Sequence, residues 1–83
     1  MSTDRERRHD AIATATAVRY LRCDVLGMSR AELARRLGVS VSRVENWERG
    51  LVAQLSDEMV DNLKRVVRAH RASQERGERR PAA

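Results

Sequence analysis

The chain has 83 residues, enough for one small domain but too few to enclose a large ligand cavity or an elaborate active site. Its 17 Lys and Arg residues, 16 of them Arg, outnumber 12 Asp and Glu and give a net charge of +5, which favours an anionic polymer as the partner. The single cysteine excludes an intrachain disulfide, and the absence of a long apolar run indicates a cytoplasmic protein without a membrane span.

Both ends of the sequence are polar and carry no apolar periodicity. Residues 1–9 and 73–83 are therefore expected to be flexible tails. Residues 10–72 contain no proline, are rich in Ala, Leu, Arg and Glu, and show no strand-like alternation. We expect this central segment to form one all-α domain.

The first helix is predicted over residues 10–25. Asp10 is suited to the N-cap, and apolar residues recur at helical spacing until Gly27, which can end the helix. The second helix is predicted over residues 30–37. Ser29 and Glu32 before and inside it are spaced as a reciprocal capping box.

The third helix is predicted to begin after Ser40, its cap, and to stop at Gly50. Only residues 38–40 separate it from the second helix. Such a tight link forces two short helices to cross steeply, which is the geometry of a helix-turn-helix. Ala34 supplies the small residue at the crossing, and Gly38 tolerates the positive φ of the turn. The residues expected to point inward are Leu33, Leu37, Val39, Val44 and Trp47.

A longer fourth helix is predicted after Ser56, because its first turn is acidic and its last turns are basic, as the helix dipole favours. One stripe of this helix is apolar and includes Met59, Val60, Leu63, Val66, Val67 and His70. We expect its first half to pack on the domain and its second half on a partner subunit. The alternative is that the whole stripe belongs to the core of one chain.

Residues 28–50 resemble the helix-turn-helix of the Cro/C1 (XRE, lambda-repressor-like) family. Ala34 matches the family's small residue, Gly38 its turn glycine, and Val44 and Trp47 the two apolar positions of its recognition helix. The ending Glu48-Arg49-Gly50 matches its acidic-x-Gly close. The resemblance implies an all-α, compact four- to five-helix bundle. It weakens after Gly50, where the family often continues with a proline-bearing loop and two further helices.

The family commonly pairs the closing glutamate with an arginine near the end of the first helix. Arg22 is the nearest counterpart here for Glu48, although it stands one residue farther from Gly27 than is usual. We interpret Glu48 as structural, because an ion pair at this partly buried junction can fix the orientation of the third helix.

The outward face of the third helix is expected in the major groove of DNA. Arg43 suits a guanine, Asn46 an adenine and Val41 a thymine methyl. Phosphates are expected at the start of the second helix, around Arg30, where free backbone amides also point outward. The complete set of predicted DNA-binding residues is Ser29, Arg30, Ser40, Val41, Ser42, Arg43, Asn46 and Arg49.

Other residues are interpreted as structural. Arg35 and Arg36 lie three and four residues after Glu32 and can form intrahelical pairs, and Trp47 is expected in the core rather than stacked on a base. Cys23 is interpreted as a small buried residue or an ordinary helix residue, not a redox switch. His9, Cys23 and His70 lack metal-ligand spacing, so neither a metal nor a cofactor is expected. The basic N-terminal segment could serve as a minor-groove arm, but its interleaved acids favour a solvated tail.

The sequence thus predicts a cytoplasmic, nucleoid-associated regulator that binds double-stranded DNA in a sequence-specific manner. We expect a repressor or autoregulator of a phage, mobile-element or toxin-antitoxin operon, acting as a homodimer on an inverted-repeat operator. The alternative is an antitoxin or adaptor that acts mainly by binding another protein, such as a toxin. No nucleophile and base, carboxylate pair or phosphate-binding glycine loop indicates an enzyme.

Overall fold

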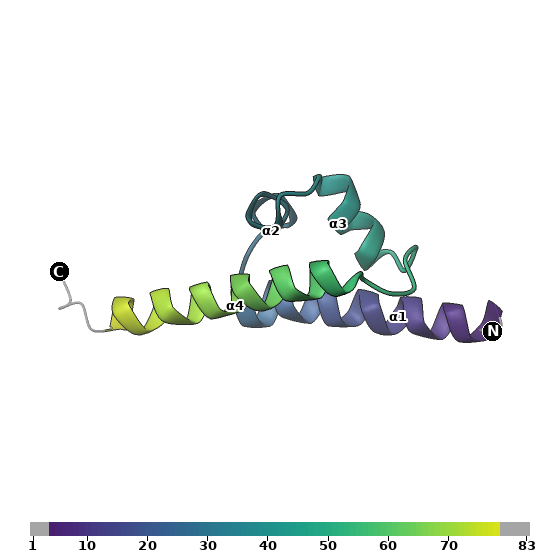
Figure 1. The fold of residues 1–83 in the computed structure, drawn as a ribbon, viewed down its shortest axis with the longest axis horizontal. Coiled ribbons are helices and arrows are strands. Elements are labelled where there is room, and N and C mark those ends of the chain that lie inside the picture. The colour runs from purple at the N-terminus through teal and green to yellow at the C-terminus, as the bar shows by residue number, and fades with distance from the viewer. Residues whose placement is uncertain (1–3, 79–83) are drawn as a thin grey trace.

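The structure is a computed structural model that describes residues 4–78. Within this range all regular elements are helical, which confirms the predicted all-α class. The chain runs through α1 (Asp4–Tyr20), a π-helical turn η1 (Leu21–Leu26), α2 (Arg30–Leu37), α3 (Val41–Glu48) and α4 (Asp57–Glu78). Figure 1 shows α2 and α3 together on one side of a layer formed by α1 and α4.

The two long helices extend farther than the sequence predicted. Helix α1 begins at Asp4, so Asp10 lies inside the helix and is not its N-cap, and α4 continues to Glu78 rather than stopping near residue 72. Most of the added residues are Arg and Glu, which are good helix formers, and elongation of an existing helix costs far less than nucleation. The other residues of the predicted tails, 1–3 and 79–83, lie outside the described residues.

A π-helical turn joins α1 to the helix-turn-helix. Gly27 ends it with φ of 60°, and the backbone N–H groups of Gly27 and Met28 both donate to the carbonyl of Arg22. Because a π turn spans one residue more than an α turn, η1 takes up the extra residue between Arg22 and Gly27. Arg22 therefore keeps its orientation towards α3 despite the longer spacing.

The predicted caps of the next three helices are confirmed. Ser29 accepts from the N–H of Glu32 at 3.1 Å, Ser40 from that of Arg43 at 3.2 Å, and Ser56 from that of Met59 at 3.1 Å. These hydroxyls satisfy amides that have no partner within their helix. Of the two bonds of the predicted capping box, the structure has the one from the Glu32 N–H to the Ser29 hydroxyl. The Glu32 carboxylate accepts instead from Arg35 and Arg36 of its own helix.

Loss of the α3 cap should weaken the fold measurably. We expect Ser40→Ala to lower the free energy of unfolding by about 1 kcal/mol, because the backbone N–H of Arg43 loses its side-chain acceptor and keeps only the Ser40 carbonyl. Urea unfolding without DNA measures this change. Ser73→Ala, at an exposed position inside α4, is the matched control and should shift stability by less than about 0.5 kcal/mol. Equal effects of the two substitutions would contradict the capping role.

The core lies where α1, α2, α3 and the first half of α4 converge. The most deeply buried side chains, Leu33, Val18 and Val44, come from three different helices. Trp47 is only 2% exposed, which confirms its predicted place in the core. The other residues predicted to face inward are buried as well, apart from Val39, which is partly buried against the same cluster. The sequence therefore identified the core of the helix-turn-helix.

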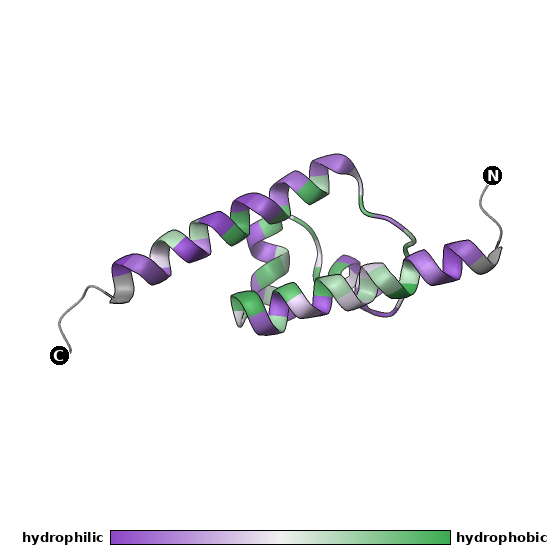
Figure 2. Cartoon of the chain, turned by 90° about the horizontal axis from the view of Figure 1, so that it is seen from below, coloured by the Kyte–Doolittle hydropathy of each residue, from purple (hydrophilic) through white to green (hydrophobic). Residues whose placement is uncertain are grey.

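The apolar stripe of α4 packs against the core of its own chain farther along the helix than expected, although Val60 is exposed. Met59 and Leu63 are buried, and Val66 and Val67 also pack against the core. The residues after Val67 belong to a segment of α4 that projects past the helix-turn-helix (Figure 1). The radius of gyration is accordingly 14.9 Å, against about 12 Å for a compact domain of this length. Figure 2 shows the first turns of α1, at the opposite end, to be strongly hydrophilic.

Candidate nucleic-acid interface

Helix α3 has one buried and one exposed face. Val44 and Trp47 point into the core, and the intervening positions leave the opposite face open to solvent. Each of the eight predicted DNA-binding residues is exposed: Ser29, Arg30, Ser40, Val41, Ser42, Arg43, Asn46 and Arg49. The structure thus presents a short helix whose outer face carries an arginine, an amide and a small apolar side chain, the groups that read base edges.

Most of the predicted residues lie near one or the other end of α3. Ser40 to Arg43 lie at its start, whereas Arg49 follows its end. Arg30, from the start of α2, also reaches the end of α3, because its Nε lies 3.4 Å from Oε1 of Glu48. With eight residues, α3 is about 12 Å long. Positive groups therefore stand at both ends of a short helix, and an α-helix of about 10–12 Å diameter fits a major groove.

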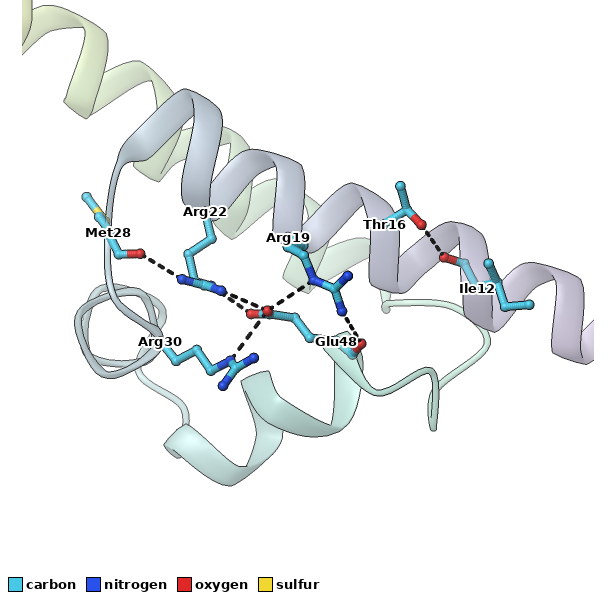
Figure 3. A network of polar contacts seen from close by, with 7 residues as sticks. All are labelled: Ile12, Thr16, Arg19, Arg22, Met28, Arg30 and Glu48. Atoms are coloured by element: carbon cyan, nitrogen blue, oxygen red, sulfur yellow. Dashed lines mark hydrogen bonds and ion pairs between the residues drawn. The ribbon is translucent and has the colours of Figure 1, made fainter.

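Glu48 fixes the end of α3 to α1. Its side chain is buried, and it accepts two hydrogen bonds from Arg22, at 2.8 Å from Nε to Oε2 and at 2.9 Å from Nη2 to Oε1 (Figure 3). The remaining terminal nitrogen of Arg22 donates to the carbonyl of Met28 at 3.1 Å. This two-pronged geometry sets both distance and orientation. The predicted structural pairing of Glu48 with Arg22 is confirmed.

Two further arginines approach the same carboxylate, and the sequence did not identify this role for either. Arg19 donates from Nη2 to the backbone carbonyl of Glu48 at 3.1 Å, and its Nε lies 3.8 Å from Oε1. Arg30 approaches from the other side (Figure 3). Both side chains are about half exposed. Arg19 stands three residues before Arg22, on the same helical face. This spacing is the one local feature of the sequence from which a contact of Arg19 with Glu48 could have been predicted.

The three arginines around Glu48, namely Arg19, Arg22 and Arg30, stabilise its negative charge. Hydrogen bonds from Arg22 hold the pKa of Glu48 below its ordinary value, although burial alone would raise it. The same bonds raise the pKa of Arg22. Glu48 is therefore ionised at neutral pH, and one negative charge is surrounded by three positive ones. The excess of positive charge lies at the exposed side chains of Arg19 and Arg30, beside the end of α3.

The structure also shows the surroundings of the residues that the sequence did not assign to DNA binding. Arg35 and Arg36 contact the Glu32 carboxylate at 3.4 and 3.5 Å, as the intrahelical alternative predicted. Cys23 is exposed on η1, which excludes the buried alternative for this residue. Over residues 4–78 no cluster of His, Cys, Asp or Glu could hold a metal ion, and none of the helices there could cross a membrane.

The comparisons with known proteins agree with this geometry. A family model described as a helix-turn-helix matches residues 18–67, from the last turn of α1 to the middle of α4. The match includes Arg22, Glu48 and the whole exposed face of α3. Searches of curated proteins and of solved structures found no match to the chain.

Proposed function

Because the chain belongs to the Cro/C1-type helix-turn-helix family of DNA-binding transcriptional regulators, we propose that it represses transcription by binding an operator in a sequence-specific manner. The regulated operon, in this proposal, is its own or that of a phage, mobile element or toxin-antitoxin pair. The observation that carries the proposal is the exposed outer face of α3. The buried ion pair of Glu48 with Arg22, called the Glu48 clamp below, holds this face in place. The protein then acts in the cytoplasm, on the nucleoid.

In the proposed complex α3 lies in the major groove. Arg43 donates two hydrogen bonds to a guanine, Asn46 pairs with an adenine, and Val41 contacts a thymine methyl. Ser42 lies beside them. All four side chains are exposed without DNA and therefore need no rearrangement of the core to reach base edges.

Phosphates are held around this reading face. Arg30 and Arg49 flank the end of α3, and the hydroxyls of Ser29 and Ser40 mark the starts of α2 and α3, where backbone amides attract anions. Glu48 orients Arg30 through its Nε, which leaves the exposed terminal nitrogens directed at solvent or phosphate. These contacts give affinity without sequence preference.

Binding should weaken steeply as salt is added. With two or more phosphates neutralised by arginine, affinity should fall at least about tenfold between 50 and 200 mM salt, because condensed counterions are released on binding. Selection from a random duplex pool first identifies the preferred site, and fluorescence anisotropy then measures its salt dependence. Enrichment of no common sequence, or affinity independent of salt, would contradict the proposal.

We further propose that two copies read an inverted repeat, because one recognition helix contacts only a few base pairs. Their mutual contact is assigned to the projecting part of α4, after Val67, since Val66 and Val67 pack against the core of their own chain. In such a pair the half-sites lie about one turn of DNA apart, near 34 Å.

The dimer has a direct test. The full chain should bind the inverted repeat at least about tenfold more tightly than an isolated half-site. A chain shortened after Arg71 should lose that preference and keep its half-site affinity. Sedimentation of the protein alone and with each duplex measures both stoichiometry and affinity. A wild-type chain that is monomeric at tens of micromolar and also monomeric on the inverted repeat would contradict this assignment.

A further inference from the structure

An open apolar groove separates α1 from α4. The first half of α4 packs against α2 and η1, and between it and α1 remains a groove of ≈ 650 Å³. Its apolar surface is formed mainly by Val18, Leu21, Leu55, Val60, Leu63 and Val67. Val60 is 36% exposed, and Leu21, Leu55 and Val67 are half-buried. An open hollow with apolar walls can receive the apolar side chains of another molecule.

The charged groups along this groove all have the same sign. Lys64, Arg68 and Arg71 follow one another along the α4 wall, and no acidic residue lines the groove. An occupant that offers apolar side chains flanked by carboxylates would satisfy both features. The groove spans residues 60–71 of α4, about 17 Å of helix. That length accepts about three turns of a helix with apolar residues at i, i+3 or i+4, and i+7.

The groove faces away from the proposed DNA interface. None of its lining residues comes from α2 or α3, and the layer of α1 and α4 lies on the opposite side of the domain from the outer face of α3 (Figures 1 and 2). An occupant and a DNA duplex can therefore be bound at the same time. A second copy paired through this groove by a two-fold axis would instead direct the two recognition helices in opposite directions.

Between residues 4 and 78 the chain offers no segment that suits the groove. The projecting part of α4, where it is described, has alanines but no large apolar residue between Val67 and Gly77. On α1, exposed Ile12 has Arg8 one turn before it, and exposed Tyr20 lies between Arg19 and Asp24, so neither offers an apolar face flanked only by carboxylates. A cationic helix would be repelled by the basic rim.

We propose that this groove binds an acidic amphipathic helix of a different protein, which joins the regulator from the side opposite DNA. The interaction gives the regulator a second input or output: a partner protein can be recruited to the operator, or can change occupancy of the operator by its own presence. The proposal goes beyond operator binding and does not depend on which sequence is bound.

A model peptide tests the groove directly. The probe is a fluorescein-labelled helical peptide with Leu at i, i+3, i+4 and i+7 and Glu at the flanking positions, titrated with the full chain and followed by anisotropy. The same peptide with Lys in place of Glu should bind at least about tenfold more weakly, because the rim is cationic. A scrambled acidic peptide should also bind at least about tenfold more weakly, because its leucines no longer share one face.

Variants distinguish the groove from general charge. Lys64→Glu with Arg68→Glu should weaken acidic-peptide binding at least about tenfold, whereas Arg65→Glu, exposed on α4 but outside the groove, should change it less than about twofold. Ala17→Glu, at an exposed groove position on α1, should also weaken it at least about tenfold. Circular dichroism verifies that every variant is helical, and each should bind the selected operator within about threefold of the wild type. Operator binding is thus tested separately from the groove.

Four outcomes would overturn the proposal. The acidic peptide fails to bind at 100 µM, or binds no better than its lysine counterpart. The rim and Ala17 variants bind it as the wild type does. The wild-type chain sediments as a dimer that Ala17→Glu dissociates, which would assign the groove to a second copy. Vesicles containing phosphatidylserine bind the chain through Lys64 and Arg68 while the peptide does not, which would assign it to a lipid surface.

Discussion

Replacing Glu48 with alanine is expected to lower the free energy of unfolding by about 3–5 kcal/mol, the cost of breaking a buried ion pair by removing one partner. Arg22, whose side chain is only 14% exposed, would lose two hydrogen bonds and keep its charge in a partly buried place. Urea unfolding followed by circular dichroism measures the loss. The end of α3 would also lose its attachment to α1, so operator affinity should fall with stability.

Two further variants control for this effect. Arg19→Ala removes a side chain that contacts Glu48 from a position 59% exposed, and should cost less than about 1 kcal/mol. Glu48→Gln keeps the shape and removes the charge, so its cost should lie between those of Arg19→Ala and Glu48→Ala. A Glu48→Ala protein as stable as the wild type would show that the clamp does not hold the fold.

The Glu48 clamp also determines the direction in which the stability of the fold changes with pH. Because the pKa of Glu48 is lowered in the folded chain, the unfolded chain takes up a proton first as the pH falls. The stabilisation is therefore complete above the ordinary pKa of glutamate, about 4.3, and is lost as the pH falls through the lower folded-state pKa. Glu48→Gln should flatten this acid limb of the stability profile.

Arg43→Ala and Asn46→Ala should each weaken binding to the selected operator by about 1–3 kcal/mol and relax the preference at one base pair. Arg30→Ala should weaken the operator and its single-base variants by the same factor and reduce the salt slope by about 1, because a phosphate contact carries no sequence information. Anisotropy titrations over a panel of single-base variants separate the two kinds of residue.

The matched control for these substitutions is Arg35→Ala. Arg35 carries the same charge on α2, but it pairs with Glu32 and lies outside the predicted interface. We expect its removal to change operator affinity less than about twofold. Unchanged selectivity in Arg43→Ala would remove that residue from the reading face, whatever its effect on affinity.

Local features of the sequence predicted the helix-turn-helix well. Ser29, Ser40 and Ser56 cap their helices as predicted, and Gly27 and Gly38 end theirs with positive φ, because caps and turns depend on a few neighbouring residues. Leu33, Val44 and Trp47 are buried as predicted from their helical spacing and from the steep crossing that the short link imposes. The choice of Arg22 for Glu48 came instead from the family resemblance.

The remaining features depend on how the helices are placed in space. The approach of Arg19 and Arg30 to one carboxylate requires the crossing of α1, α2 and α3, which no local pattern specifies. The start of α1 at Asp4 was missed because a polar helix extension has no apolar periodicity to reveal it. The groove was not foreseen either, since it depends on the separation of α1 from α4.

The wide turn from Leu21 to Leu26 bears on how such a chain can change in length over evolution. One residue added inside an ordinary α-helix rotates everything beyond it by about 100°, which would turn the recognition helix away from its groove. Here the additional residue is confined to a single loosened turn, and the bond between Arg22 and Glu48 retains its geometry. A turn of this kind can therefore take up one residue while Arg22 still meets Glu48, so that the direction of α3 relative to α1 does not depend on the length of the junction before α2.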